Sequence, residues 1–389
     1  MPDSDNRPPA LLITRNLPPL VGGMERLVWH IADELRAAYA LHVVAPTGCE
    51  AHLPSGVTAS GVALRPLWRF LLSSTWASLR QALRLRPRLV FAGSGLTAPI
   101  AWLAARLAGG HCVVYLHGLD IETRHPLYRF LWHPFLRRFD RVIANSRFTR
   151  ELAADIGIAR ERLTILHPGV HMPEMASADQ QRQDFRERHR LADSPLMLYV
   201  GRITERKGLL PFVRDVLPGV IAAIPDARLV VIGDEPTQAL LSDGGLRERI
   251  HAQLRDSGLE QHVLFLGELP VQHPDIDAAY FAADVLVFPV QDRPGDNEGF
   301  GMVAVEAAAH GLPTVAFAVG GVKDAVAEGK SGYLVEAGDN QRFTQRVNDI
   351  LRVPSGHPEQ LDIRRHAIEF AWPAFGERLR RLAAEAGSA

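Results

Sequence analysis

The chain has 389 residues, of which 47% are hydrophobic and 22% charged, an ordinary composition for a globular protein. Two cysteines, Cys49 and Cys112, exclude a disulfide framework and a cysteine-based metal site, so we expect a reducing compartment. The acidic, proline-bearing start MPDSDNRPPA argues against a signal peptide. The longest apolar stretch, from Leu96, contains Arg106 and falls short of the roughly 18 residues that span a bilayer. We therefore expect a soluble or peripheral protein of about two domains.

The formal net charge of -1 is unevenly distributed. Residues 1–170 contain 20 arginines, no lysine and 12 acidic residues, a balance of +8, whereas the remainder carries -9. This asymmetry suggests that the first half meets an anionic partner, such as a membrane surface or a phosphorylated acceptor. The alternative is that the arginines are scattered without a role. The sequence does not resemble a nucleic-acid-binding module, because it contains no basic stripe interleaved with aromatic residues in a recognisable motif.

Short apolar runs alternate with helix-length segments along the chain, in two successive series. This alternation is typical of parallel sheets covered by helices on both faces, and two series predict two doubly wound, Rossmann-like α/β domains that face each other. The predicted strands of the first series are 10–14, 41–46, 88–93, 112–118, 141–146 and 163–170. Those of the second series are 195–202, 227–234, 262–268, 284–290, 312–318 and 332–337.

The polar stretch 171–190 is the best candidate for a linker and the entry to the second domain. We expect an N-terminal domain over 1–172 and a C-terminal domain over 173–365. The amphipathic segment 366–389 is predicted to be a helix that crosses back onto the first domain and completes it.

Open parallel sheets bind ligands beyond the carboxyl ends of their strands, where glycine-rich turns lead into helices. The first such turn is PPLVGGMERLV, in which the backbone N–H groups of Gly22 and Gly23 are placed to approach a phosphate. A plain strand-to-helix turn explains the same residues. The second turn is YVGRITERKGLLPFV, where Arg202 and Lys207 suit a diphosphate that gains negative charge as it departs. A solvated loop is the alternative there.

The third turn, QDRPGDNEGFG, leads into the helical stretch MVAVEAAAH. Gly299 and Gly301 permit unusual backbone torsions, and the N–H groups of Phe300, Gly301 and Met302 then face outward at a helix start that attracts anions. Because a carboxylate does not bind phosphate, we expect Glu298 and Glu306 to accept hydrogen bonds from sugar or ribose hydroxyls. A buried Glu–Arg pair is the alternative.

These motifs resemble the retaining glycosyltransferases of the GT-B fold, group 4. EGFGMVAVE matches the family's E-x7-E motif, and GGMERLV, HGLD, ANSRFTRE, GRITERKG and GGVKDAV occur in the family's order over nearly the whole chain. The resemblance implies two Rossmann-like domains across a cleft, the first binding the acceptor and the second the nucleotide sugar. It also implies transfer of a hexosyl group from a UDP-, GDP- or ADP-sugar, without a metal or other cofactor, to a glycan or lipid-linked acceptor.

The resemblance assigns roles by motif position. Glu306 would hold the ribose hydroxyls, and Glu298 the hydroxyls of the transferred sugar. Arg202 and Lys207 would clamp the diphosphate with help from backbone N–H groups at Gly22, Gly23, Phe300 and Gly301, and His117 would stand beside the sugar. Asn145 and Ser146 are cleft-lining candidates with a structural role as the alternative. Two positions depart from the family pattern. The family commonly has a glutamate in the segment GGVKDAV, where Asp324 is the nearest acid, and Glu235 stands where the family more usually has a glycine.

The inferred reaction is same-face attack, with the leaving phosphate taking the acceptor's proton. Asp275 and Asp277 are interpreted as flanking a helix start rather than binding a metal. Three rival functions fit parts of the pattern: a sugar-nucleotide epimerase of the same architecture, a lectin-like binder, and a nicotinamide-dependent oxidoreductase. The last is suggested by a G-x-G-x-x-A run at Gly93, Gly95 and Ala98, but the ribose-binding acid expected about 20 residues on is not well placed.

The arginine-rich first half bears on the acceptor. Stretches from Leu64 and from His125 mix aromatic residues with arginines, as a helix resting on an anionic bilayer does. Core packing of the aromatic residues is the alternative. We expect a bacterial, cytoplasmic enzyme of cell-envelope polysaccharide, lipopolysaccharide or glycolipid synthesis, peripheral on the inner membrane.

Overall fold

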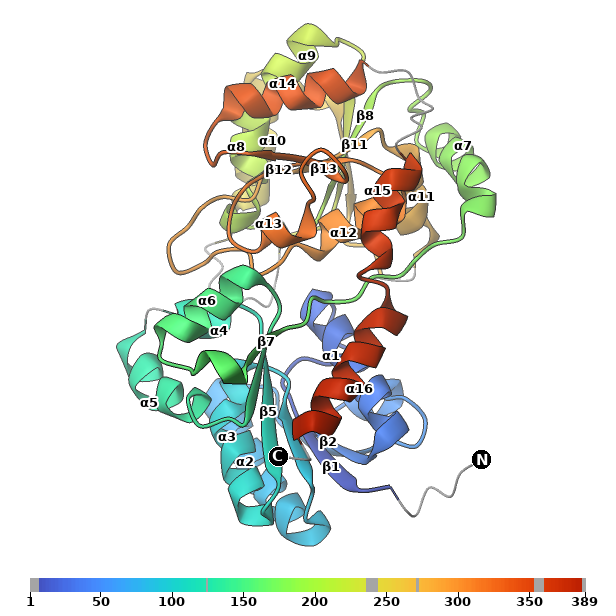
Figure 1. The fold of residues 1–389 in the computed structure, drawn as a ribbon. Helices are drawn as coiled ribbons and strands as arrows, with labels where there is room; N and C mark the ends of the chain where they lie inside the picture. Colours follow the sequence, from blue (N-terminus) through green and yellow to red (C-terminus); the bar gives the residue numbers. More distant parts are fainter. Residues whose placement is uncertain (1–6, 124, 236–243, 271–272, 353–359, 387–389) are drawn as a thin grey trace. The chain divides into compact units, whose positions relative to one another are not determined.

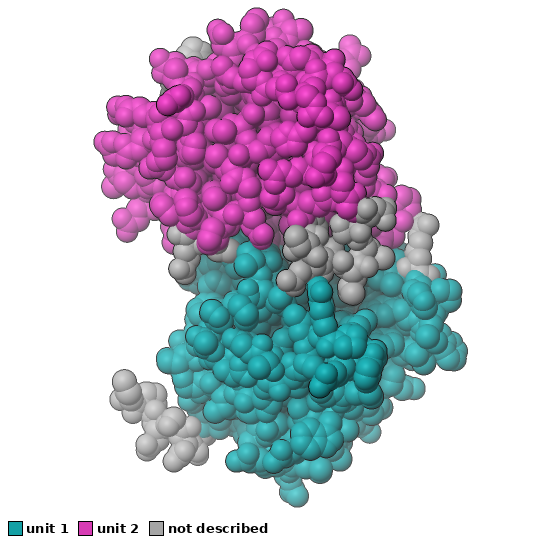
Figure 2. Space-filling view, turned by 180° about the vertical axis from the view of Figure 1, so that it is seen from behind, with its two compact units in different colours: residues 1–169, 372–389 teal, residues 170–371 magenta. Residues whose placement is uncertain are grey.

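The computed structural model describes residues 7–123, 125–235, 244–270, 273–352 and 360–386, and it divides into two compact units (Figures 1 and 2). Unit 1 comprises residues 1–169 and 372–389, and unit 2 comprises residues 170–371. These divisions lie at 169/170 and 371/372, whereas the sequence places them at 172/173 and 365/366. Each unit is an α/β layer structure around one parallel sheet, as the sequence pattern predicts.

The sheet of unit 1 has seven parallel strands in the order β3-β2-β1-β4-β5-β6-β7. Its central strands are short runs of apolar residues with both faces buried, as expected of a sheet covered by helices on both sides. The strands are β1 Pro9–Ile13, β2 Ala40–Pro46, β3 Thr58–Val62, β4 Leu89–Ala92, β5 His111–Leu116, β6 Arg141–Ala144 and β7 Leu163–Ile165.

Side chains alternate between two hydrophobic clusters, one on each face of this sheet. In β1, Leu12 belongs to the cluster shared with α1 and α16, whereas Leu11 and Ile13 belong to the cluster shared with α2 and α3. Figure 1 shows α1 and α16 side by side on the first face. The helices of unit 1 are α1 Gly23–Ala38, α2 Leu67–Leu85, α3 Ala98–Ala108, α4 Leu119–Glu122, α5 Pro126–Leu136, α6 Arg147–Asp155 and α16 Trp372–Ala386.

Two parts of the predicted fold differ from the structure. The edge strand β3, TASGV, was not predicted, because only Val62 of the five residues is buried and the rest lack an apolar pattern. The predicted helix 366–389 is two helices, α15 Gln360–Ile368 in unit 2 and α16 in unit 1. Residues 387–389 of that prediction lie outside the described residues.

The sheet of unit 2 has six parallel strands in the order β10-β9-β8-β11-β12-β13, around a single hydrophobic core. The strands are β8 Leu196–Val200, β9 Arg228–Ile232, β10 Val263–Gly267, β11 Val285–Phe288, β12 Thr314–Phe317 and β13 Gly332–Val335. The remaining helices are α7 Ala178–Arg188, α8 Leu209–Asp215, α9 Leu217–Ala223, α10 Leu246–Asp256, α11 Pro274–Ala282, α12 Met302–Ala309, α13 Val322–Ala325 and α14 Asn340–Leu351.

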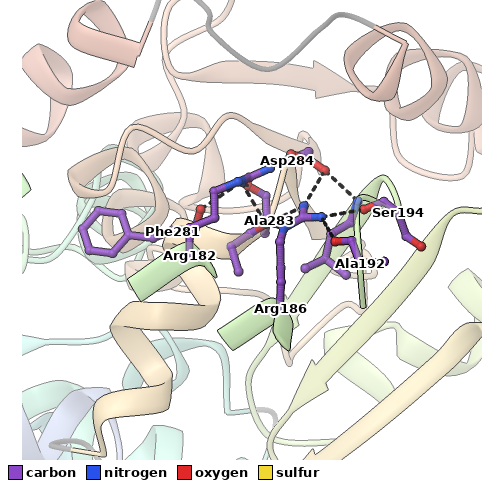
Figure 3. A network of polar contacts seen from close by, with 9 residues as sticks. Arg182, Arg186, Ala192, Ser194, Phe281, Ala283 and Asp284 are labelled. Atoms are coloured by element: carbon purple, nitrogen blue, oxygen red, sulfur yellow. Dashed lines mark hydrogen bonds and ion pairs between the residues drawn. The ribbon is translucent and has the colours of Figure 1, made fainter. Parts of the chain in front are cut away.

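Most of the stretch predicted as a linker, 171–190, is the helix α7, which packs against α11 within unit 2. Figure 3 shows why it is fixed: Arg182 and Arg186 both reach Asp284, at 2.8 Å and 3.1 Å, just before β11. Arg186 also donates to the backbone oxygens of Ala282, Ala192 and Ser194. The segment 171–190 is polar on average, but most of it forms a helix that these arginine contacts hold in place.

Each sheet has a topological switch point, where the strand order reverses, at the corresponding place. It lies between β1 and β4 in unit 1 and between β8 and β11 in unit 2. In doubly wound sheets the loops after these strands diverge and leave a crevice for a ligand.

Candidate active site

The loops that follow β8 and β11 flank the switch point of unit 2 and are joined to each other. The backbone N–H of Gln291 donates to the carbonyl of Arg206 at 2.8 Å. Gly208 has φ +74°, and a Cβ atom there would lie 1.9 Å from the carbonyl oxygen of Pro289. Only glycine fits this position, because both the torsion and the close approach exclude a side chain.

Lys207 and Glu298 form an ion pair that bridges these two loops. Lys207 Nζ lies 2.8 Å from Glu298 Oε2, and both side chains are largely buried. Burial favours the neutral form of Glu298, but the nearby charges of Lys207 and Arg206 outweigh it, so the pKa of this carboxyl is lowered. Burial also lowers the pKa of Lys207, an effect that Arg206 reinforces and Glu298 opposes.

Arg206 is a site residue that the sequence did not single out. Its guanidinium lies 3.5 Å from Glu298 Oε2 and 3.4 Å from Asp296 Oδ1, and it donates to the carbonyl of Asn297. Arg202, which the sequence did predict, is exposed, and its charge acts on both Lys207 and Glu298. The loop after β8 therefore presents three cations around one carboxylate.

Glu306 is half-buried on α12. It follows Glu298 closely in the sequence but has a different hydrogen-bond partner. Tyr280 Oη donates to Glu306 Oε2 at 3.1 Å. The ring of His310 stacks on Tyr280 with centroids 4.8 Å apart, and His310 Nε2 lies 3.1 Å from Asp277 Oδ1. Glu306 thus accepts from a phenol. The Glu–Arg pair of the alternative is found instead at Glu298, through Arg206.

The start of α12 is shaped by glycines. Gly301, with φ +98°, precedes the helix, and a Cβ there would meet the ring of Phe288. The Gly320–Gly321 turn packs on the backbone of Glu298 and Gly299, and Gly321 N donates to Glu298 O at 2.8 Å. The first N–H groups of a helix lack intrahelical acceptors, so the segment Phe300–Met302 offers donors and a positive dipole end.

Other predicted site residues lie in unit 1. His117 follows β5, is buried, and its Nε2 lies 2.8 Å from the carbonyl of Gly93. A carbonyl only accepts, so this nitrogen carries a proton. The backbone N–H of His117 donates to Asp120 Oδ2 at 2.9 Å, and Asn145 Nδ2 donates to the His117 carbonyl. These bonds fix the imidazole at the carboxyl edge of the sheet.

Gly22 and Gly23 stand at the start of α1, as predicted, but a carboxylate is close by. A Cβ on Gly22 would lie 2.4 Å from Glu25 Oε2, and Glu25 Oε1 accepts from Asn16 Nδ2 at 2.8 Å. An anion bound there would meet this negative charge. Ser146, the other cleft candidate, accepts from Thr149 N and caps α6, which is a structural role.

Four further findings concern the remaining predictions. Within the described residues no group of three or more His, Cys, Asp or Glu side chains is arranged to hold a metal ion, and none of the helices is long and apolar enough to cross a membrane. Asp275 pairs with Arg188 and lies 3.7 Å from His189 at the start of α11. Glu235 accepts from the N–H groups of Leu246 and Arg247, and so contributes to the start of α10.

Two family models match the chain in succession. The model described as glycosyltransferase family 4 matches residues 21–172, and the model described as glycosyl transferases group 1 matches residues 181–369. The two matches correspond closely to units 1 and 2.

The chain is also similar to characterised proteins and solved structures. It is 30% identical over 383 residues to a GDP-mannose-dependent alpha-(1-6)-phosphatidylinositol monomannoside mannosyltransferase of Mycolicibacterium smegmatis, covering 96% of this chain and 97% of the relative. A D-inositol 3-phosphate glycosyltransferase of Mycobacterium marinum is 32% identical over 60% of this chain and 47% of its own length. The structure of Anabaena Alr3699/HepE in complex with UDP and glucose superposes with a TM-score of 0.79 at 20% identity, covering 97% of this chain and 100% of that chain.

Proposed function

Because the chain belongs to the group 1, family 4 glycosyltransferases, we propose that it transfers a hexosyl group from a nucleotide-diphosphate sugar to a lipid-linked or glycan acceptor, with retention of the anomeric configuration. Unit 2 recognises the donor and unit 1 the acceptor. The product belongs to a bacterial cell-envelope glycolipid or polysaccharide.

The observation that supports this proposal most directly is the cation cluster around Glu298. Lys207 and Arg206 contact Glu298 from the loop after β8, and the exposed Arg202 adds its charge. A diphosphate that leaves a sugar gains negative charge, and fixed cations at that position stabilise the transition state more than the ground state. An ammonium has three donors, so Lys207 can hold Glu298 and a phosphate oxygen at the same time.

We assign the remaining donor contacts to the elements beside this cluster. The N–H groups at the start of α12, after Gly299 and Gly301, bind phosphate oxygens. Glu306 accepts from the ribose hydroxyls, and Glu298 from a hydroxyl of the transferred sugar. These cations and dipoles supply the positive charge that the leaving group needs, so we expect no requirement for a metal ion.

In the proposed reaction, the bond between the anomeric carbon and the diphosphate breaks as the acceptor hydroxyl attacks from the same face. The acceptor's proton passes to the departing phosphate oxygen, and the pair of electrons of the broken bond stays with that oxygen. His117, which is held by Gly93 and by the turn around Asp120, positions the transferred sugar.

For the donor we propose GDP-mannose, and for the acceptor a phosphatidylinositol-type glycolipid, on the basis of the M. smegmatis relative, which this chain matches along almost its entire length. UDP- and ADP-sugars are the competing donors. An epimerase of the same architecture differs in its product, which is an epimeric nucleotide sugar without transfer.

A surface of unit 1 supports a lipid acceptor. The helices α2, α3 and α5 pack in sequence, α3 contacting both neighbours. Their outer side chains include Trp68, Trp76 and Phe130, which are 64%, 66% and 77% exposed. The same helices expose further large apolar residues, namely Leu72, Leu83, Leu103, Leu107, Leu127 and Leu131. We call this set the apolar surface of unit 1.

The charges around the apolar surface support an anionic bilayer as its partner. The three helices contain arginines but not one aspartate or glutamate, and Arg80 lies over the ring of Trp76 at 5.4 Å. Aromatic and aliphatic side chains that enter a headgroup region, flanked only by cations, match an interfacial helix on anionic lipid. We therefore propose that the enzyme works on the cytoplasmic face of the inner membrane.

The function is tested by turnover. Purified protein is incubated with GDP-mannose, UDP-glucose or ADP-glucose and with phosphatidylinositol monomannoside in mixed vesicles, and products are separated by mass. We expect a mannosylated lipid from GDP-mannose, and NMR of the product should show the same anomeric configuration as the donor. Release of an epimeric nucleotide sugar, or a product of inverted configuration, would contradict the proposal.

A further inference from the structure

Helix α11 carries two buried aromatic residues in succession, and only the first has a hydroxyl. Tyr280 is 2% exposed and Phe281 is 8% exposed. A buried hydroxyl costs free energy unless it is hydrogen-bonded, so a phenol at this position needs a partner. Tyr280 Oη donates to Glu306 Oε2 at 3.1 Å, from α11 to α12. The polar atom of this side chain therefore reaches the carboxylate that we assign to the ribose.

The ring of Tyr280 is itself held by His310, which follows the last residue of α12. The two rings stack with their centroids 4.8 Å apart and their planes 23° apart. The ring of Phe281 meets the same imidazole edge-on, with centroids 4.7 Å apart. His310 is therefore packed between the two aromatic residues of α11 and the end of α12.

Both nitrogens of His310 face acceptors. Nδ1 lies 2.8 Å from the carbonyl oxygen of Glu306, and Nε2 lies 3.1 Å from Asp277 Oδ1. The hydrogen bond from His310 lowers the pKa of Asp277, although burial opposes this effect, so the carboxylate is ionised at neutral pH. Because neither partner donates, both nitrogens do, and the ring is an imidazolium. A cation against the face of Tyr280 is attracted to it and fixes the phenol.

The carboxylate of Glu306 has the capacity to accept from a ligand as well as from Tyr280. An ionised carboxylate offers about four lone-pair positions, and the phenol uses one of them. A glutamate side chain loses rotamer freedom when it is fixed, a cost that otherwise falls on ligand binding. Because Tyr280 already restrains Glu306, ribose hydroxyls that bind this carboxylate meet a preorganised acceptor.

We propose that Tyr280, held by His310 and Asp277, is a positioning residue that presents the Glu306 carboxylate to the ribose hydroxyls of the nucleotide sugar. This inference rests on the proposed function, of which it names the group that lets unit 2 select a ribonucleotide donor. Tyr280 acts through Glu306 and not on the bond that breaks. Its loss therefore weakens donor binding and raises KM, while kcat stays within about a factor of two.

Calorimetric titration of the protein with GDP and with 2′,3′-dideoxy-GDP tests the proposal. Wild type should bind GDP about tenfold or more tightly than the dideoxy analogue, because the analogue leaves Glu306 without its hydroxyl partners. Tyr280→Phe keeps the ring on His310 and removes only the phenolic oxygen. It should weaken GDP binding about fivefold or more and leave binding of the dideoxy analogue unchanged.

A merely structural tyrosine would give a different result. Its loss would weaken GDP and the dideoxy analogue by the same factor, or leave both unchanged, and either outcome would overturn the assignment. The ratio of the two affinities is measured within one preparation, so a partly unfolded variant does not alter it. Steady-state kinetics with GDP-mannose gives a second readout, in which a fall in kcat at unchanged KM would also contradict a positioning role.

Tyr333→Phe is the matched control, because it removes a phenolic oxygen elsewhere in unit 2. The guanidinium of Arg346 lies over the Tyr333 ring at 4.6 Å, a contact that phenylalanine keeps. This variant should bind both nucleotides as wild type does. A loss of GDP affinity equal to that of Tyr280→Phe would show that the effect is not specific to Glu306.

The same titrations, repeated with UDP and ADP and their dideoxy analogues, separate this inference from the proposed function. If wild type discriminates against a dideoxy analogue and Tyr280→Phe discriminates equally, the positioning role is wrong and the proposed function stands. If wild type binds a nucleotide and its dideoxy analogue equally, Glu306 does not bind the ribose and the inference fails, whereas turnover of GDP-mannose still supports transfer. If none of the nucleotides binds, both proposals are wrong.

Discussion

Lys207 Nζ and Glu298 Oε2 lie 2.8 Å apart, which joins the loop after β8 to the loop after β11 across the switch point of unit 2. The pair holds in place a cation and an acid that we assign to different parts of the donor. Changing either residue therefore alters the position and ionisation of the other.

The variant Lys207→Ala should lower kcat/KM by roughly 100- to 1,000-fold, the usual cost of removing one preorganised donor from a developing anion. The comparison is Lys330→Ala, since Lys330 is an exposed lysine of the same unit. Steady-state kinetics with varied GDP-mannose measures both. If Lys207→Ala retains kcat/KM within a factor of about three, the ammonium does not stabilise the leaving group.

The variant Gly208→Ala should destabilise unit 2 and disable the site, because the new Cβ meets the Pro289 carbonyl that packs against the loop after β8. Gly329→Ala is a matched control: its φ of +70° is close to the +74° of Gly208, but nothing lies within 4 Å of its added Cβ. The control should cost about 1 kcal/mol of torsional strain in the free energy of unfolding. Equal losses for the two variants in urea titration would show that the loop contact is unimportant.

The variant Arg186→Ala should lower the free energy of unfolding of unit 2 by about 3–5 kcal/mol, since it leaves Asp284 and several buried carbonyls with fewer donors. Arg186 is only 8% exposed. In contrast, Arg214→Ala, which removes an exposed pair with Asp215, should cost less than about 1 kcal/mol. Urea unfolding followed by fluorescence checks both variants. Similar values would mean that the α7 contacts add no stability.

Substituting serine for both Trp68 and Trp76 should reduce binding to anionic vesicles about tenfold or more, because each buried aromatic ring contributes a few kcal/mol of transfer free energy. Leu361→Ser is the control, because Leu361 is 67% exposed but lies in unit 2. Flotation with phosphatidylglycerol vesicles measures the bound fraction, and added salt should weaken binding. If the wild-type protein floats equally well with neutral and with anionic vesicles, the arginines do not have the proposed role.

The stability of unit 1 should depend on His30 at mildly acidic pH. Burial lowers the pKa of His30 to about 4, an effect that Asp33 opposes and Arg26 adds to, and the His30 ring stacks on Trp372 with centroids 3.6 Å apart. Because the folded pKa is below the unfolded one, the unfolded chain binds more protons between the two values. Stability is therefore complete above about pH 6.5 and falls as the pH drops towards 4, by about 2 kcal/mol after allowing for partial exposure.

His30→Phe keeps a ring against Trp372 but removes the titration. The difference in unfolding free energy between about pH 7 and pH 4.5 should therefore be smaller in this variant than in wild type. An identical pH dependence in both proteins would exclude His30 as the source.

Much of the fold was predictable because its signal is local. Every strand except β3 appears in the sequence as an apolar run, since strands buried on both faces must be apolar throughout. The edge strand β3 escaped because exposed positions impose no pattern. The helix α7 escaped because its two key arginines, Arg182 and Arg186, are held by Asp284, about a hundred residues away.

The site was predictable to the level of its loops. The sequence predicted the importance of the turns after β8 and β11 from their glycines and cations, and the family resemblance is confirmed by the matching models. It did not predict that Lys207 and Glu298 contact each other, or that Arg206 joins them, because pairing between two loops depends on strand order rather than on local pattern. The assigned catalytic roles stay predictions.

The position of α16 has a consequence for how the protein is made. Phe375, Leu379 and Ala383 of this helix belong to the hydrophobic cluster on the α1 face of unit 1, although the rest of that unit ends at residue 169. During translation, therefore, every residue of unit 2 is synthesised before α16, the last helix of unit 1. Unit 1 is thus the first unit to begin to emerge and the last to be completed. A truncated message yields a chain with an exposed hydrophobic face on unit 1, which quality-control proteases can recognise.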